Sequence, residues 1–137
     1  MLIKALIVMM NAHKWQKDKA GKPYFLHPLT VFFKVKGTDL KIVALLHDTV
    51  EDTDITLQKL SKLGFNDVQL NAIDAITKRK DEDYSDYLKR VKQNNIAREV
   101  KLADLAHNMN IRRLLVVTNK DTERIEKYKK ALLFLSA

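Results

Sequence analysis

Residues 42–52 read IVALLHDTVED, an apolar run of five residues that leads directly into a group of ionisable side chains. Four such side chains fall within six positions: His47, Asp48, Glu51 and Asp52. The apolar run predicts a buried helix, and charged groups at its end need an opposite charge or a metal ion. Glu51 comes four residues after His47, so it is expected one helical turn further on, on the same side.

Two further signals lie far from this stretch. His27 stands upstream, and Asp104 lies within the apolar segment 100–106, where a buried aspartate needs a partner. Together with the His-Asp pair at 47–48, they offer two imidazoles and two carboxylates. This mixed set of nitrogen and oxygen ligands favours zinc, manganese or iron. The alternatives are a capping role for His27 and an ion pair between Asp104 and Lys101.

Two acidic residues are left over by this ligand set, and they suit hydrolytic chemistry. A bound metal ion lowers the pKa of water. Glu51 and Asp52 could then orient that water, take its proton or protonate the leaving group. A charge cluster at the following turn is the alternative for this pair. His13 and His107 are interpreted as structural or supporting residues. The pattern indicates a metal-dependent hydrolase.

The length and composition of the chain limit the kinds of protein that it can be. The length of 137 residues predicts a single domain, 1–137, and a hydrophobic content of 46% is ordinary for a globular core. Cysteine is absent from the sequence, which excludes disulfides, thiolate metal sites and a cysteine nucleophile, and favours an intracellular, cytoplasmic setting. No apolar run approaches the ~18 residues of a membrane span, so no membrane partner is expected.

The net charge of +8 is unevenly distributed. Four lysines fall within 14–22, just before His27, and four basic residues fall within 124–130. Acidic residues gather at 48–54 and 81–86. A positive rim beside a carboxylate-rich metal site suits a phosphorylated substrate. Nucleic acid is not expected as a partner, because the basic residues lack the interleaved aromatics of a single-strand binder.

The chain is predicted to be all-α. It holds only three glycines and two prolines, which gives little support to strands and turns. Residues 18–24 are expected to form a loop, and residues 79–86 a polar, exposed segment. Asn66 and Gln69 resemble a capping box. Helical spacing of apolar residues and these end signals predict helices over 1–10, 28–37, 38–47, 56–64, 66–76, 84–91, 96–115 and 122–134.

Four stretches resemble a known family. They read GKPYFLHPLTV at 21–31, ALLHDTVEDT at 44–53, ITK at 76–78 and VKLADLAHNM at 100–109. These stretches are similar to those of the HD-domain metal-dependent phosphohydrolases, and more closely to the hydrolase domain of the RelA/SpoT alarmone enzymes and to small stand-alone alarmone hydrolases. The resemblance implies a compact multi-helix HD-domain bundle, and the length is expected to leave no room for a synthetase domain.

The resemblance also implies a reaction, the removal of the 3′-pyrophosphate from guanosine tetra- or pentaphosphate. Glu51 and Asp52 would handle the attacking water. The metal would be Mn²⁺, with Zn²⁺ or Fe²⁺ as other candidates, and its ligands would be His27, His47, Asp48 and Asp104. The nucleotide would be bound by Lys17, Lys19, Lys78, Lys101 and Asn108.

Three departures from the family pattern fall on the side that is expected to face the substrate. Asp18 and Leu105 each replace a basic residue, and Asn110 with Ile111 replaces an Arg-Thr pair. They keep two other functions open: an HD-type phosphatase or pyrophosphatase for another nucleotide, and a basic binding module with an idle metal site. A homo-oligomer is compatible with the sequence.

Overall fold

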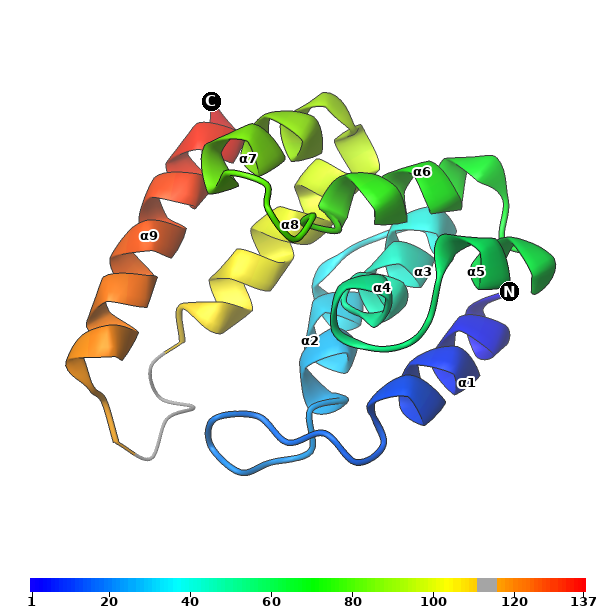
Figure 1. Ribbon diagram of the computed structural model, residues 1–137, viewed down its shortest axis with the longest axis horizontal. Coiled ribbons are helices and arrows are strands. Elements are labelled where there is room, and N and C mark those ends of the chain that lie inside the picture. Colours follow the sequence, from blue (N-terminus) through cyan, green and yellow to red (C-terminus); the bar gives the residue numbers. More distant parts are fainter. Residues whose placement is uncertain (111–115) are drawn as a thin grey trace.

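The computed structural model describes residues 1–110 and 116–137 (Figure 1). Within these residues the regular structure is helical and no strand is present, which confirms the predicted all-α class. None of the helices there is long and apolar enough to span a bilayer. The helices are α1 (Leu2–His13), α2 (Leu26–Lys34), α3 (Thr38–Leu46), α4 (Thr49–Asp52), α5 (Leu57–Lys62), α6 (Asp67–Ile76), α7 (Tyr84–Gln93), α8 (Asn95–Asn108) and α9 (Asn119–Ser136).

The centre of the bundle is α3, the helix that the apolar run predicts. Five consecutive residues of α3, 42–46, are almost completely buried, so this half of the helix has no face left for solvent. It packs against α1, α2, α6 and α8. Full burial of a Leu, Ile or Val side chain contributes roughly 1.5–3 kcal/mol, which makes α3 the main apolar contribution to the core. Its carboxyl end, where the ionisable residues begin, is therefore fixed from several sides.

Local signals account for several helix ends. Asn66 and Gln69 form the predicted capping box at the start of α6. Thr56 caps α5 by accepting a hydrogen bond from the backbone N–H of Lys59. Pro28 lies in the first turn of α2, where its missing N–H has no intrahelical partner. Gly37 joins α2 to α3 with a φ of 95°, a value that glycine adopts without strain.

Several predicted boundaries are wrong by three residues or more, and one helix was not predicted. The first helix continues to His13 instead of residue 10, and the second ends at Lys34 instead of residue 37. The long helix expected over 96–115 ends at Asn108, and its expected last part, 111–115, lies outside the described residues. The last helix begins at Asn119 and not at Thr122, because Thr118 and Asp121 form a capping box there. The short helix α4 is not among the predicted helices.

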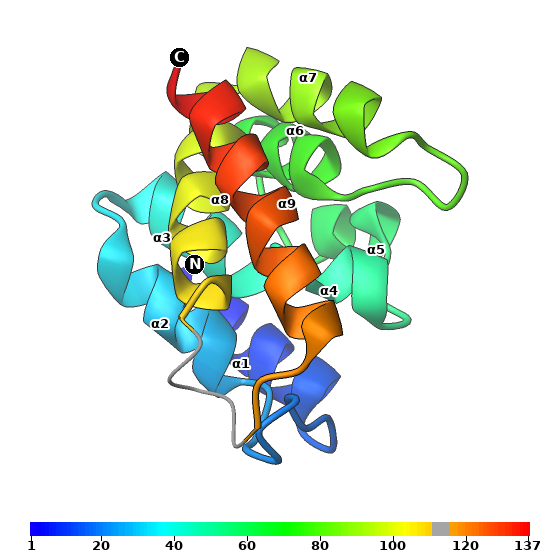
Figure 2. The same ribbon diagram turned by 90° about the vertical axis from the view of Figure 1, so that its left-hand side faces the viewer.

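The last two helices enclose one side of the functional residues. In Figure 2, α9 lies across α8, and its amino-terminal end approaches the loop between α1 and α2. The carboxyl half of α9 packs against α7. The loop before α2, the end of α8 and the beginning of α9 contribute residues to the lining of one pocket.

The segment between α6 and α7 is less exposed than expected at one position. Glu82 is only 13% exposed, because its carboxylate forms a two-bond pair with Arg90. Arg90 also donates to the backbone carbonyl of Thr77 at 3.0 Å. The pair therefore fixes the end of α6 to α7.

Candidate metal centre and its pocket

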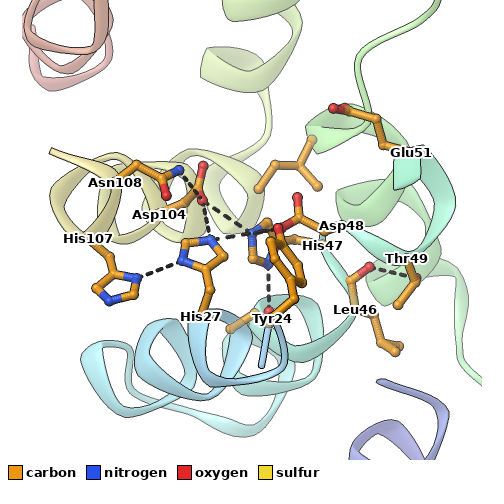
Figure 3. Close-up of polar contacts among 12 residues, drawn as sticks. Tyr24, His27, Leu46, His47, Asp48, Thr49, Glu51, Asp104, His107 and Asn108 are labelled. Carbon is orange, nitrogen blue, oxygen red and sulfur yellow. Dashed lines mark hydrogen bonds and ion pairs between the residues drawn. The ribbon is translucent and has the colours of Figure 1, made fainter. Parts of the chain in front are cut away.

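Four side chains converge at the carboxyl end of α3 (Figure 3). Each offers one ligand atom, and these atoms all lie within 4.8 Å of one another. α2 provides one residue, the junction of α3 and α4 provides two, and α8 provides the last. They are the four residues that the sequence predicts as metal ligands: His27, His47, Asp48 and Asp104.

Both histidines turn the same ring nitrogen toward the carboxylates. The Nε2 atom of His27 lies 2.7 Å from Oδ1 of Asp104 and 3.8 Å from Oδ2 of Asp48. The Nε2 atom of His47 lies 3.3 Å and 3.1 Å from the same two oxygens. His47 donates from Nδ1 to the carbonyl of Ala44 at 2.6 Å. Because this bond occupies Nδ1, Nε2 is the ring nitrogen left to bind a cation at the centre.

The junction after Leu46 explains how two successive residues serve one site. Side chains of neighbours on a straight helix differ in direction by ~100°. Here α3 ends at Leu46, and α4 begins at Thr49 with Asp48 at its N-cap position. The change of helix direction turns the side chains of His47 and Asp48 toward the same point.

The charges of the cluster match a cation. Burial alone would raise the pKa of Asp104, but Lys101, whose Nζ lies 3.0 Å from Oδ2, and the two imidazoles hold it well below its usual range. Burial likewise disfavours a charged His47, yet Asp48 and the bonds to both carboxylates raise its pKa. Two ionised carboxylates thus lie around imidazole nitrogens, and a divalent cation fits this donor set.

Tyr24 supports the cluster, and the sequence analysis missed it. Its hydroxyl donates to Oδ2 of Asp48, and its ring lies between His13 and His27, with centroids at 4.9 Å and 5.8 Å. Burial, together with the charge of Asp48, raises the pKa of Tyr24, so the hydroxyl keeps its proton. An aromatic residue three positions before a candidate ligand was the available signal.

The two candidate catalytic carboxylates lie on α4, outside the ligand set. Glu51 lies apart from the four ligands in Figure 3, and its Oε1 accepts the backbone N–H of Lys78 at 2.7 Å. Asp52 borders a hollow that also contains Gln16. Partial burial and the negative charges of Asp48 and Glu51 raise the pKa of Asp52 to about 6.

A pocket of about 260 Å³ opens beside the cluster, between the loop before α2, the end of α8 and the beginning of α9. Tyr24 and His27 form its wall toward the metal ligands. Three of the predicted substrate-binding residues line it: Lys17, Lys19 and Asn108. Two residues of α9 also line it: Arg124, which belongs to the predicted positive rim, and Tyr128, which the sequence analysis left unassigned.

Two other predicted substrate residues lie elsewhere among the described residues. Lys101 is largely buried on the far side of Asp104, with its Nζ 5.4 Å from the ring centroid of Tyr87. Lys78 lies next to Glu51 and donates from Nζ to the carbonyl of Arg79 at 3.3 Å.

The residues that depart from the family pattern lie in different parts of the structure. Asp18 and Asn110 line the pocket. Leu105 is completely buried in the core, so the expectation that it faces the substrate is wrong. Ile111 lies outside the described residues.

Known proteins resemble this chain in sequence. A GTP pyrophosphokinase rsh from Brucella melitensis is 34% identical over 125 residues, covering 80% of this chain and 16% of the relative. A probable guanosine-3′,5′-bis(diphosphate) 3′-pyrophosphohydrolase from Synechocystis is 30% identical, covering 80% and 16%. A GTP pyrophosphokinase from Streptomyces coelicolor is 35% identical, covering 82% and 15%. The chain thus spans about a sixth of the length of these relatives. No family model matches the chain.

A solved structure shares the fold. It is described as a metazoan ortholog of SpoT that hydrolyzes ppGpp, and it superposes with a TM-score of 0.81 at 21% identity, covering 98% of this chain and 84% of that one. The helical bundle with two histidines and two aspartates converging at one helix junction defines the HD class. Within that class, the chain is similar to the RelA/SpoT-type enzymes over the residues matched.

Proposed function

We propose that this chain is a metal-dependent phosphohydrolase that removes the 3′-pyrophosphate from guanosine 3′,5′-bis(diphosphate). The observation that carries the proposal is the four-ligand cluster beside a pocket with basic residues on its wall. The name of the Synechocystis relative and the description of the metazoan structure support the same substrate. The cytoplasmic location and a homo-oligomer stay predictions from the sequence.

The proposed metal is Mn²⁺, with Zn²⁺ or Fe²⁺ as alternatives, because a set of two imidazoles and two carboxylates suits all three. The proposed ligands are His27, His47, Asp48 and Asp104. A divalent metal bound there would act as a Lewis acid and lower the pKa of water.

The carboxylates of α4 provide the acid–base chemistry in this proposal. Asp52 has a pKa raised to about 6, so at neutral pH it is mostly ionised and is a better proton acceptor than an ordinary aspartate. Glu51 is oriented by the backbone of Lys78 and would help to position the attacking water or protonate the leaving group.

The pocket would receive the nucleotide. Lys17 and Lys19 bring positive charge to one wall, which attracts phosphate groups, and Asn108 would contact the ribose region at the end next to Asp104. Lys78, beside Glu51, remains a proposed substrate contact. For Lys101, the ion pair with Asp104 favours a supporting role over direct contact with the nucleotide.

A second candidate is the hydrolysis of a different nucleotide by the same machinery. It is favoured by Asp18 and Asn110, which line the pocket where the family pattern has basic residues. A carboxylate at this wall repels phosphate and accepts hydrogen bonds from a base or sugar.

The test is hydrolysis of guanosine tetraphosphate with Mn²⁺, measured as released pyrophosphate and GDP. We expect release that stops when chelator is added. The matched control is Asp104→Ala, which removes one ligand and should lose metal and activity together. If the folded, metal-loaded chain releases no pyrophosphate, the proposed substrate is wrong, and a panel of other nucleotides tests the second candidate.

A further inference from the structure

His107 is a histidine that the proposed reaction does not use, and it contacts a candidate ligand directly. It lies on α8, three residues after Asp104, so both side chains project from the same side of the helix. Its ring lies edge to edge with that of His27, with centroids 4.9 Å apart and planes inclined by only 12°. The two Nδ1 atoms are 2.6 Å apart (Figure 3).

A single proton must lie between these two nitrogens, because two Nδ1–H groups could not approach so closely. The Nε2 atom of His27 faces the carboxylates, and it can act as a metal ligand only when the ring proton is on Nδ1. In that state Nδ1 of His27 donates, and Nδ1 of His107 accepts.

The other ligand histidine has an equivalent arrangement. His47 donates from Nδ1 to the carbonyl of Ala44, which fixes its tautomer from within its own helix. His27 lies in the first turn of α2, and its acceptor comes from α8 instead. A partner of this kind fixes ring orientation and raises the basicity of the ligating nitrogen.

We propose that His107 is a positioning residue that holds His27 in the Nδ1–H tautomer and thereby sets the metal affinity of the site. The inference rests on the proposed metal site. In this proposal α8 contributes twice to the site. It supplies the ligand Asp104 and, one turn later, the residue that orients the ligand His27 of α2.

Two variants with side chains of similar shape distinguish the loss of the hydrogen-bond acceptor of His107 from the loss of its ring packing. In His107→Asn the side-chain oxygen can take the place of Nδ1, whereas His107→Leu has a similar shape and no acceptor. Mn²⁺ binding to the 137-residue chain is measured by competition with a chelating dye. We expect His107→Leu to lower the affinity by roughly 10–100-fold and His107→Asn to restore most of it. Melting in chelator shows whether each variant is folded.

The possible results distinguish a failure of the positioning role from a failure of the proposed metal site. Equal affinities of the Leu and Asn variants would overturn the positioning role, because loss of ring packing affects both alike. If His107→Leu does not fold, His107→Ala takes its place in the comparison with His107→Asn. If the unaltered chain binds no Mn²⁺, Zn²⁺ or Fe²⁺, the proposed metal site itself fails.

Discussion

Asp104 shows how a buried carboxylate is kept ionised. Its Oδ2 accepts from Lys101 at 3.0 Å, and its Oδ1 accepts from Asn108 at 3.1 Å and faces both imidazoles. Both oxygens are therefore fixed in direction before any cation arrives. A ligand held in this way loses little freedom on binding, which raises affinity.

Tyr24 offers a test of the same principle at Asp48. Tyr24→Phe keeps the ring between the two histidines and removes only the donor to Oδ2. We expect Mn²⁺ affinity to fall by about 10-fold, because the carboxylate loses the group that orients it. The measurement is the chelating-dye competition. The control is Tyr87→Phe, which loses a hydroxyl bond to the carbonyl of Ile76 instead. Equal losses in both variants would contradict the role of Tyr24.

The two carboxylates of α4 are expected to act after binding. Glu51→Gln and Asp52→Asn should bind Mn²⁺ as the unaltered chain does, because neither residue belongs to the ligand set. Turnover should fall by roughly 10²–10⁴-fold, the usual contribution of a positioned acid or base. Activity and bound metal are measured on the same samples. Full activity of either variant would show that its carboxylate has no acid–base role.

At this scale the sequence predicted the four converging residues and a supporting role for His107, but it missed Tyr24 and could not show which atoms the supporting groups orient. His47 and Asp48 follow a buried run, and chemical type alone marks them as ligands. Tyr24 and His107 act through the direction of one donor or acceptor atom. That direction depends on how α2 and α8 face each other, which spacing along the chain does not encode.

Among the elements, α6 and α7 are joined by the Glu82–Arg90 pair, and its effect should depend on pH. Bonds from Arg90 lower the pKa of Glu82 from 4.5 to about 2. A lowered pKa in the folded state stabilises the fold above the unfolded pKa, and this contribution is lost as the pH falls through the folded pKa.

Glu82→Gln should therefore lower the free energy of unfolding at pH 7, and the difference should shrink between about pH 4.5 and pH 2. Urea unfolding at several pH values measures it. Glu99→Gln, a change at an exposed position, serves as the control. A difference that stays constant with pH would mean that the carboxylate charge is not responsible.

Capping boxes mark the starts of two helices, and only one of the two was predicted from the sequence. The Asn66 box was recognised, but Thr118 with Asp121 was not, and α9 was placed three residues late. The apolar residues after Asn108 continue a helical spacing, although α8 stops there. Asn108 and Asn110 favour helix ends over interiors, and this preference outweighed the periodicity.

For the whole molecule, the scarcity of glycine and the helical spacing were enough to predict an all-α bundle. They could not show that α9 crosses α8 to form one wall of the pocket. Arg124 was consequently expected only as part of a general positive rim, and Tyr128 had no expected role, since their place beside the loop before α2 follows from long-range packing alone.

Binding of Mn²⁺ should stabilise the entire fold, because the ligands join α2, the α3–α4 junction and α8. At a free metal concentration 100 times the Kd, the gain is about 2.7 kcal/mol, which raises the Tm by several degrees. Calorimetry with metal and with chelator measures the shift. Asp104→Ala should show none, and an equal rise in that variant would indicate binding elsewhere.

The long separation of the ligands along the chain has a consequence during synthesis. Asp104 follows His27 by 77 positions, and both belong to the same cluster. A ribosome delivers two histidines and one aspartate well before the last donor exists. The nascent chain therefore cannot complete the site until α8 has been translated and has packed against α2 and α3. Metal binding during synthesis would thus indicate that these helices have assembled.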